Sequence, residues 1–255
     1  MDFFLQLLIN GVSIGFLYGL SAMGFVMIFK SSSVLNFAHG EILAFGAFLF
    51  LALVTWAQLP VALAFVVTLA GSFVLGFVIE RIFLRPLIGE PLIQVIMLTV
   101  GLASMFKGGM LLVWGGNLYT YPEFLPEGLG IDWGIIQVPP VYVAAIVIGS
   151  LFLLMFGLFF KFSSQGIYMR SVADNQPAAL SLGVHVRRVF ALSWAIAALV
   201  AGISGIVLGI INGINVHELS SIGLKVFPVV ILGGLDSIGG AIIGGLIIGL
   251  LETFT

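Results

Sequence analysis

The sequence predicts an all-α polytopic membrane protein with about seven spanning helices. Of its 255 residues, 61% are hydrophobic and 8% are charged, and the mean hydropathy is +1.26. In a typical soluble domain, about a quarter of the residues are charged. So many apolar runs cannot surround one soluble core, and lipid must therefore solvate the outside of the molecule. The 33 glycines fit this class, because neighbouring helices in a membrane satisfy the backbone groups that glycine frees.

Seven apolar segments are long enough to cross a bilayer, which takes about 20 residues. They are residues 3–29, 36–57, 61–79, 91–115, 140–160, 190–212 and 225–254. The second and the last are the least regular. No basic stretch precedes the first, and it is longer than the apolar part of a signal peptide, so we expect it to remain as a helix. We expect residues 1–255 to form a single transmembrane domain.

Basic residues mark alternate loops. Seven of the nine lie in three of these loops, namely Lys30, Arg81, Arg85, Lys161, Arg170, Arg187 and Arg188. The positive-inside rule places such loops in the cytoplasm. The long loop from Asn117 to Pro139 contains Glu123, Glu127 and Asp132 and no base, as expected outside. With seven crossings, the N-terminus is predicted outside and the C-terminus inside.

Several classes of function are not supported. The net charge of −2 gives no reason to expect a nucleic acid partner. Without cysteine there is no disulfide and no thiolate metal site, and the sequence has no HExxH motif. It also lacks the G-x-x-x-x-G-K-[ST] phosphate loop of many ATPases. The turn at Gly202-Ile203-Ser204-Gly205 resembles that of an intramembrane serine hydrolase, but none of the three histidines is clearly placed to activate Ser204. We therefore predict no catalytic and no metal-binding residues.

The stretch NFAHGE, residues 36–41, places polar side chains between two apolar runs. An ionisable side chain in a spanning segment costs roughly 2.5 to 3.5 kcal/mol on insertion scales and is therefore a functional-site hypothesis. We expect Asn36 to cap a helix that begins at Phe37, with His39 and Glu41 in its first turns. These residues either form a structural cluster beside Lys30 or line and gate a transport path. We favour the second interpretation.

Two further charges lie in apolar segments. Lys107 either lines a cavity or extends its ammonium to the membrane surface. Asp236 interrupts the last segment, whose halves 226–235 and 241–251 are each too short to span at 1.5 Å per residue. The pattern predicts a broken helix, as in transporters where irregular backbone lines a cavity, although Asp236 could also cap the second half. The predicted transport pathway or gate is Asn36, His39, Glu41, Lys107 and Asp236.

The pattern of the long cytoplasmic loop from Lys161 to Arg188 predicts two amphipathic segments, separated by the start of a helix. Asp174 or Asn175 can cap the second helix, Pro177 fits its first turn, and Gly183 can end it in a left-handed conformation. A helix of residues 177–182 is too short to be stable alone and must pack against something. Its small apolar face, predicted to be Ala178, Ala179 and Leu182, suits either a groove on a partner or the bilayer surface.

Three motifs together resemble the permease subunits of branched-chain amino acid ABC importers. They are NFAHGE at 36–41, RSVADNQPAALSLG at 170–183 and LGGLDSIGGAIIGG at 232–245, in the order expected for that family. Ala178-Ala179 followed by Gly183 also fits the Glu-Ala-Ala loop of importers, with Pro177 in place of Glu. The resemblance covers nearly the whole chain. It implies eight crossings, of which the last would follow Gly249 to Glu252 and is not found here.

The resemblance implies a multi-pass protein of the bacterial inner membrane that moves branched-chain or other small apolar amino acids by alternating access. It implies no cofactor in this chain, because two separate ATP-binding subunits would hydrolyse ATP. They would act through the coupling loop, with the residues Arg170, Asp174, Asn175, Pro177, Ala178, Ala179, Leu182 and Gly183. Further implied partners are a related permease, as a heterodimer, and an extracytoplasmic binding protein that docks at 117–139 and 212–224.

Two questions stay open at this point. Relatives of the family also carry urea, amides or aromatic acids, so the sequence does not name the substrate. A self-contained secondary transporter or channel for a small polar solute would also fit the composition and the broken helix. Such a protein has no need of a capped docking helix in the cytoplasm, which favours the importer subunit.

Overall fold

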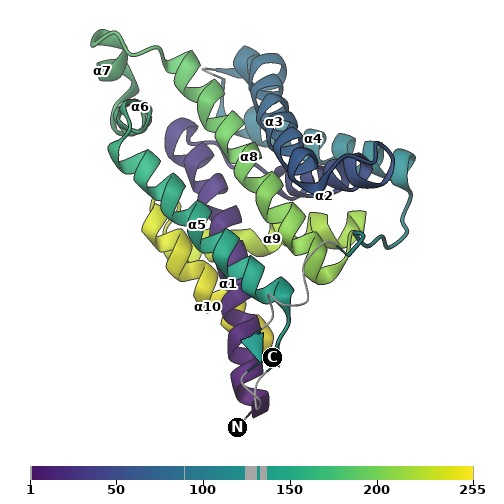
Figure 1. Ribbon diagram of the computed structural model, residues 1–255. Coiled ribbons are helices and arrows are strands. Elements are labelled where there is room, and N and C mark those ends of the chain that lie inside the picture. Colours follow the sequence, from purple (N-terminus) through teal and green to yellow (C-terminus); the bar gives the residue numbers. More distant parts are fainter. Residues whose placement is uncertain (1, 89, 124–130, 133–136, 255) are drawn as a thin grey trace.

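The computed structural model describes residues 2–88, 90–123, 131–132 and 137–254 (Figure 1). The helices are α1 (Asp2–Ser32), α2 (His39–Thr55), α3 (Val61–Ile79), α4 (Leu92–Trp114), α5 (Pro140–Phe162), α6 (Ser164–Asp174), α7 (Gln176–Ser181), α8 (Val186–Asn212), α9 (Val216–Gly233) and α10 (Ile238–Phe254). A π-helical turn, η1 (Glu80–Leu84), and a 3-10 turn, η2 (Arg85–Leu87), extend α3. The strands β1 (Ile131–Asp132) and β2 (Gln137–Val138) pair antiparallel in the long outer loop.

The predicted all-helical, polytopic class is confirmed. Among the described residues, six helical stretches are long and apolar enough to cross a membrane, and α2 and α10 are shorter apolar helices of 17 residues each. The spanning stretches of α1 and α8 are 78% and 83% buried, whereas those of α3, α4 and α5 are at most 28% buried. The chain therefore packs around α1 and α8, and the outer helices present apolar side chains to lipid.

Glycines set the packing of α1 against α10, which run antiparallel. Gly245 lies against Gly19 and Gly249 lies against Gly15, so closely that a Cβ atom at Gly245 would overlap the backbone of Gly19. Small residues at this spacing let membrane helices approach closely. The sequence indicated the spacing along each helix, and the structure shows which helix each glycine faces.

The last predicted crossing, residues 225–254, is a hairpin of two helices. Gly233 packs on Gly240 and Gly244 packs on Val229, so α9 and α10 lie side by side. Gly234 makes the turn with φ +92°, a conformation that glycine adopts without strain. A broken helix was expected near Asp236; the structure instead has two separate helices that fold back on each other. Hydropathy alone does not distinguish a helix that continues after a break from one that reverses.

This hairpin corrects the predicted position of the C-terminus. Because α10 returns along α1, the Phe254 ring contacts the Phe4 ring in a tilted arrangement, with centroids 5.3 Å apart. Both ends of the described chain lie at the same end of the molecule (Figure 1), and the prediction of termini on opposite sides is wrong. Once α9 and α10 are separated, the described residues contain eight apolar helices.

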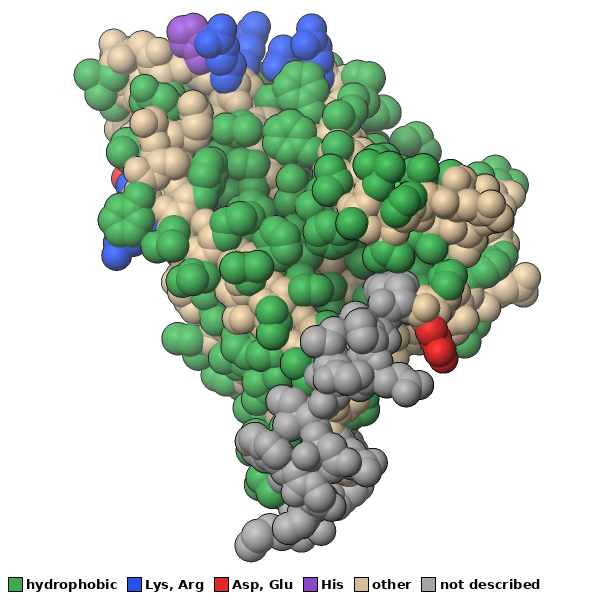
Figure 2. Space-filling model, viewed as in Figure 1, with side chains coloured by type: hydrophobic (Ala, Val, Ile, Leu, Met, Phe, Trp, Pro, Cys, Tyr) green, Lys and Arg blue, Asp and Glu red, His purple; other side chains and the backbone are tan. Residues whose placement is uncertain are grey.

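The basic loops gather at the opposite end, as predicted. Lys30 lies over the Phe160 ring at 5.7 Å, and Arg170 donates to the carbonyl oxygen of Phe160. Arg85, Arg187 and Arg188 line one groove beside α7. Figure 2 shows Lys and Arg side chains at this end of the molecule. The positive-inside rule makes it the cytoplasmic end. Of the predicted outer acidic residues, Glu127 lies outside the described residues.

A chain without cysteine allows a direct test of this topology. Single cysteines at Glu123 and Phe254 should react with an impermeant maleimide in intact cells, because both positions lie away from the basic end. A cysteine at Arg170 should react only after the cells are permeabilised. Labelling of the Arg170 variant in intact cells, or of the Phe254 variant only after permeabilisation, would contradict the arrangement.

The glycine contact between α1 and α10 predicts a position-specific loss of stability. Gly245→Val should destabilise the detergent-solubilised protein, because overpacking costs about 1 to 3 kcal/mol or more. Gly239→Val is the matched control on α10, since a Cβ there has no neighbour within 4 Å. Thermal unfolding followed by size-exclusion chromatography measures both. Equal effects of the two substitutions would refute a specific role for the contact.

Candidate functional site

A polar cavity of about 310 Å³ opens on the flank of the bundle between α2, α4 and α9. Its polar lining residues are Glu41, Ser104, Lys107, His217, Ser220 and Ser221. Its apolar walls include Phe37, Val100, Ala103 and Leu224. The volume is at the lower end of the range of small-molecule pockets, about 300 to 1,000 Å³. A cavity with convergent polar groups inside a membrane bundle is the candidate transport site.

The cavity depends on where α2 begins. His39 lies level with the middle of α1, where its Nε2 atom is 3.1 Å from Ser21 Oγ and its ring meets Phe25 edge-on. From Phe25, α1 continues for roughly another 10 Å at 1.5 Å per residue before it ends at Ser32. The non-helical segment 33–38 thus returns into the bundle before α2 starts. NFAHGE lies within the protein and not at the cytoplasmic surface.

The predicted role of Asn36 as a helix cap is wrong. The helix begins at His39, after Ala38, and no side chain caps it. Instead, the Asn36 Oδ1 atom accepts a hydrogen bond from the Ala38 amide at 3.1 Å, and the Asn36 carbonyl accepts one from the His39 amide at 3.3 Å. Asn36 therefore stabilises a tight turn ahead of the helix, an alternative that asparagine side chains readily form.

Two buried atoms of this stretch have no hydrogen-bond partner among the described residues. They are Asn36 Nδ2 and His39 Nδ1, in side chains that are 0% and 1% exposed. A buried polar group without a partner costs about 1 to 3 kcal/mol. Native proteins hold few of them, and each calls for an explanation beyond packing. Phe37 and Glu41 line the cavity, and Asn36 and His39 are close neighbours of these two residues in the sequence.

Close backbone contacts hold α2 in this position. Gly40 packs on Gly223 of α9, and Gly46 packs on Gly202 of α8. Both contacts are too close for a larger side chain without a shift of the backbone. They fix the first turn of α2, and with it Glu41, against the helices on either side.

Glu41 and Lys107, both predicted pathway residues, meet at the cavity. The Glu41 residue is 8% exposed, and Lys107 is partly exposed. The two side chains line the same cavity, and no ion pair within 4.0 Å joins them among the described residues. Of the two interpretations of Lys107, the geometry supports cavity lining.

Sequence reasoning missed the contribution of α9. Residues 212–224 were assigned to an outer loop, yet α9 begins at Val216, capped by the Asn215 side chain. His217 and Ser221 are exposed on the same face, one helical turn apart, and Lys225 continues this face. This spacing of four was the signal that could have identified a helix with a polar face.

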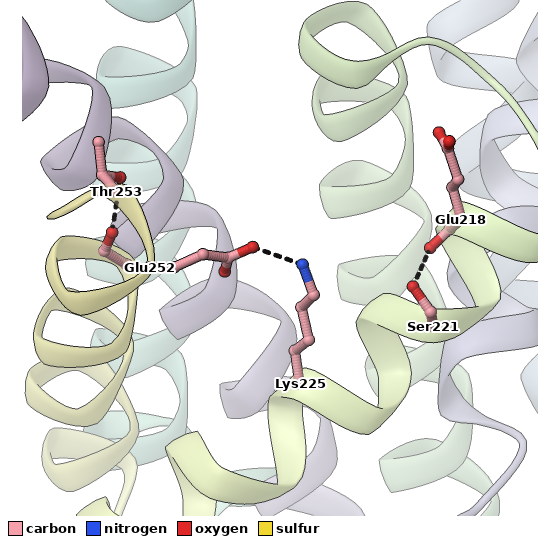
Figure 3. Close-up of polar contacts among 6 residues, drawn as sticks. Glu218, Ser221, Lys225, Glu252 and Thr253 are labelled. Carbon is pink, nitrogen blue, oxygen red and sulfur yellow. Dashed lines mark hydrogen bonds and ion pairs between the residues drawn. The ribbon is translucent and has the colours of Figure 1, made fainter. Parts of the chain in front are cut away.

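The polar face of α9 extends to an ion pair with α10. Figure 3 shows Lys225 reaching across to Glu252, with Ser221 and Glu218 on the preceding turns of α9. The two charged side chains are 43% and 36% exposed. Paired charges on the flank of a membrane bundle indicate that this flank does not face lipid alone.

Asp236 lies apart from the other four predicted pathway residues. It is exposed in the turn between α9 and α10, and its carbonyl accepts a hydrogen bond of 3.1 Å from Lys30. Ser237, rather than Asp236, caps α10, because its Oγ accepts from the Gly240 amide at 3.0 Å. Asp236 therefore lies at the cytoplasmic end of the hairpin and does not line the cavity.

The predicted coupling helix is present as α7. The Asn175 Oδ1 atom caps it by accepting from the Ala178 amide at 2.9 Å, Pro177 lies in its first turn, and Gly183 ends it with φ +83°. These three roles are confirmed, and of the two candidate caps it is Asn175 that acts. Asp174 ends α6 and is exposed. Arg170 donates hydrogen bonds to the carbonyl oxygens of Phe160 and Lys161 and so stabilises the end of α5.

The predicted exposed face of this helix requires one correction. Ala179 is 2% exposed and packs in the same cluster as Met169 and Val186. The helix turns this side inward because the Val184 amide folds back to the Ala179 carbonyl at 2.9 Å. Ala178 is exposed as expected, and Leu182 is 83% exposed. The free surface of α7 is therefore centred on Leu182.

The hydrolase interpretation receives no support from the position of Ser204. Its side chain is buried in α8 and donates to the Val200 carbonyl at 3.2 Å. His39 faces Ser21, and His185 lies 3.1 Å from the carbonyl oxygen of Gly183. Neither histidine is in position to activate Ser204.

Comparisons with known proteins agree with this architecture. A family model described as "Branched-chain amino acid transport system / permease component" matches residues 7–255. The permease protein BraD of Pseudomonas aeruginosa, named as part of a high-affinity branched-chain amino acid transport system, is 29% identical over 98% of this chain and 86% of its own length. The corresponding LivH of Escherichia coli is 28% identical over 99% of this chain and 86% of its length.

A third relative has a similar identity to this chain. A probable branched-chain amino acid transport permease protein LivH of Methanocaldococcus jannaschii is 28% identical over 92% of this chain and 75% of its own length. No solved structure matches the chain. The family match spans nearly all of the sequence, including the three motifs, the cavity and α7. The chain therefore belongs to the family of permease components of branched-chain amino acid transport systems.

Proposed function

We propose that this chain is the permease subunit of an ABC importer in the bacterial inner membrane, and that it moves branched-chain or other small apolar amino acids by alternating access. The observation that carries this proposal is α7. It is a capped helix of six residues at the cytoplasmic end, and it displays Leu182 to the solvent. A self-contained transporter or channel has no use for such a helix.

The surroundings of α7 suit a docked protein partner. One side of the helix packs on the chain's own core through Ala179, which gives it a rigid base. Beside it, Arg85, Arg187 and Arg188 line an open groove of about 640 Å³. A small apolar helix that presents a leucine fits a groove on another protein. We assign this surface to the ATP-binding subunits, which would hydrolyse ATP and move α7. The chain itself is proposed to bind no cofactor.

The polar flank suits a second permease subunit. Charged side chains exposed to hydrocarbon cost roughly 2.5 to 3.5 kcal/mol each on insertion scales. Lys225, Glu252 and the mouth of the cavity with Lys107 share the flank formed by α4, α9 and α10. A related permease covering this flank would remove that cost and would place the transport pathway between the two subunits.

The outer end offers a surface for a substrate-binding protein. Tyr119 and Ile214 form a backbone bridge with hydrogen bonds of 2.9 and 2.8 Å, and the Asn215 side chain donates to the Gly116 carbonyl at 2.9 Å. These contacts join the described part of the loop 117–139 to the turn before α9. We propose that an extracytoplasmic binding protein docks on this joined surface and delivers the substrate.

Uptake by the reconstituted complex tests the proposal. Proteoliposomes containing this chain, the related permease and the ATP-binding subunits should accumulate labelled leucine when the binding protein and ATP are present. Labelled urea is the comparison substrate. Uptake by this chain without the ATP-binding subunits would instead support a self-contained transporter, and preference for urea would change the assigned substrate.

The exposed face of α7 predicts a coupling variant. Leu182→Asp should lower transport and substrate-stimulated ATPase activity together, because a charge buried in the docked groove costs several kcal/mol. The protein should still insert, since Leu182 makes no core contact. Ser171→Asp adds the same charge to α6 and is the control. Normal ATPase stimulation in the Leu182 variant would exclude docking through this residue.

The buried histidine predicts a variant that separates stability from transport. His39→Gln keeps a group that can bond to Ser21 Oγ, so the melting temperature should change little. If His39 acts in the conformational step that limits turnover, uptake should fall several-fold. Ser204→Ala, which removes a local bond within α8, is the control. Unchanged uptake in His39→Gln and Glu41→Gln would leave NFAHGE with a structural role.

A further inference from the structure

We propose that Glu41 and Lys107 recognise the two charged groups of a zwitterionic α-amino acid, with the Lys107 ammonium pairing with the carboxylate and the Glu41 carboxylate pairing with the substrate ammonium. This inference rests on the proposed function. It adds which atoms of the substrate the chain recognises, and it distinguishes amino acids from urea, amides and aromatic acids.

The placement of the two charges supports this assignment. They come from different helices, α2 and α4, and line the same cavity of about 310 Å³. No direct ion pair of 4.0 Å or less joins them in the described part of the chain. A ligand that carries both a positive and a negative charge can therefore lie between the two side chains and form one short ionic contact with each.

The cost of an uncompensated charge distinguishes amino acids from urea and aromatic acids as substrates. Glu41 is almost fully buried, so an uncompensated charge there is costly. A neutral molecule such as urea would leave both charges without an ionic partner. An aromatic acid would pair with Lys107 and place a second negative charge near Glu41. A zwitterion compensates both.

The rest of the cavity suits the remainder of such a substrate. Phe37, Val100, Ala103 and Leu224 provide apolar surface for an aliphatic side chain. Ser104 and Ser221 add hydroxyl groups at the exposed rim. A few polar groups that fix orientation within apolar walls are the usual design of a small-molecule site.

Protection of an engineered cysteine tests the assignment without transport. Because the chain has no cysteine, Ser221→Cys places one thiol on the cavity, and Ser150→Cys on α5 places a control thiol outside it. The complex in nanodiscs, without binding protein, is labelled with a maleimide. L-leucine should slow labelling of the Ser221 variant several-fold. Urea, 4-methylpentanoate and 3-methylbutylamine should protect far less, because each lacks one or both charges.

Charge variants in the Ser221→Cys chain complete the test. Lys107→Met should reduce protection by leucine to the level of 3-methylbutylamine, and Glu41→Gln should reduce it to the level of 4-methylpentanoate. Lys107→Arg, which keeps the charge, should retain protection. Protection by urea equal to that by leucine, or leucine protection that survives both neutral variants, would overturn the assignment. ATP-dependent leucine uptake without any protection by leucine would overturn it as well, while leaving the proposed function intact.

Discussion

Backbone contact between glycines is the constraint on which the rest of this structure depends. In lipid, helices gain little from burying apolar side chains against each other, so close approach and dispersion must hold them together. Gly19 with Gly245 joins α10 to α1, and Gly40 with Gly223 fixes the start of α2 on α9. The second contact holds Glu41 at the cavity. The same type of contact that stabilises the bundle therefore also positions the candidate transport site.

The polar groups divide into two sets with different physical roles. At the cytoplasmic end, Arg170 and Asn175 satisfy helix ends, and Lys30 bonds to the turn at Asp236. These groups define the chain's shape where water is near. Within the bundle, Glu41 and Lys107 face a cavity, and one ring nitrogen of His39 has no partner in the described part of the chain. Such groups are costly at this depth, and the proposed transport role therefore centres on them.

The two ends of the molecule are connected through rigid helices. Helix α7, the proposed coupling helix, packs on α8 and on the cluster that includes Met169. Helix α8 runs from this contact through the centre of the bundle, where Gly202 meets Gly46 of α2. A displacement of α7 by a bound partner therefore has a continuous path of packed groups to the helix that carries Glu41. The path consists of packing contacts only. Whether α7 and the cavity are energetically coupled through it is measured by the Leu182→Asp variant.

The sequence by itself determined the membrane class, the cytoplasmic end and the short capped helix at Asn175 to Gly183, because hydropathy, charge bias and turn chemistry are local properties. It also identified Glu41 and Lys107, since a charge in an apolar run is visible without a fold. Only the tertiary structure decided that residues 225–254 form a hairpin, that Ala179 faces inward and that α9 contributes His217 and Ser221 to the cavity. Each of these depends on which segments pack against each other, and that is decided by contacts between residues far apart in the sequence, such as Gly40 with Gly223 and Ala179 with Met169.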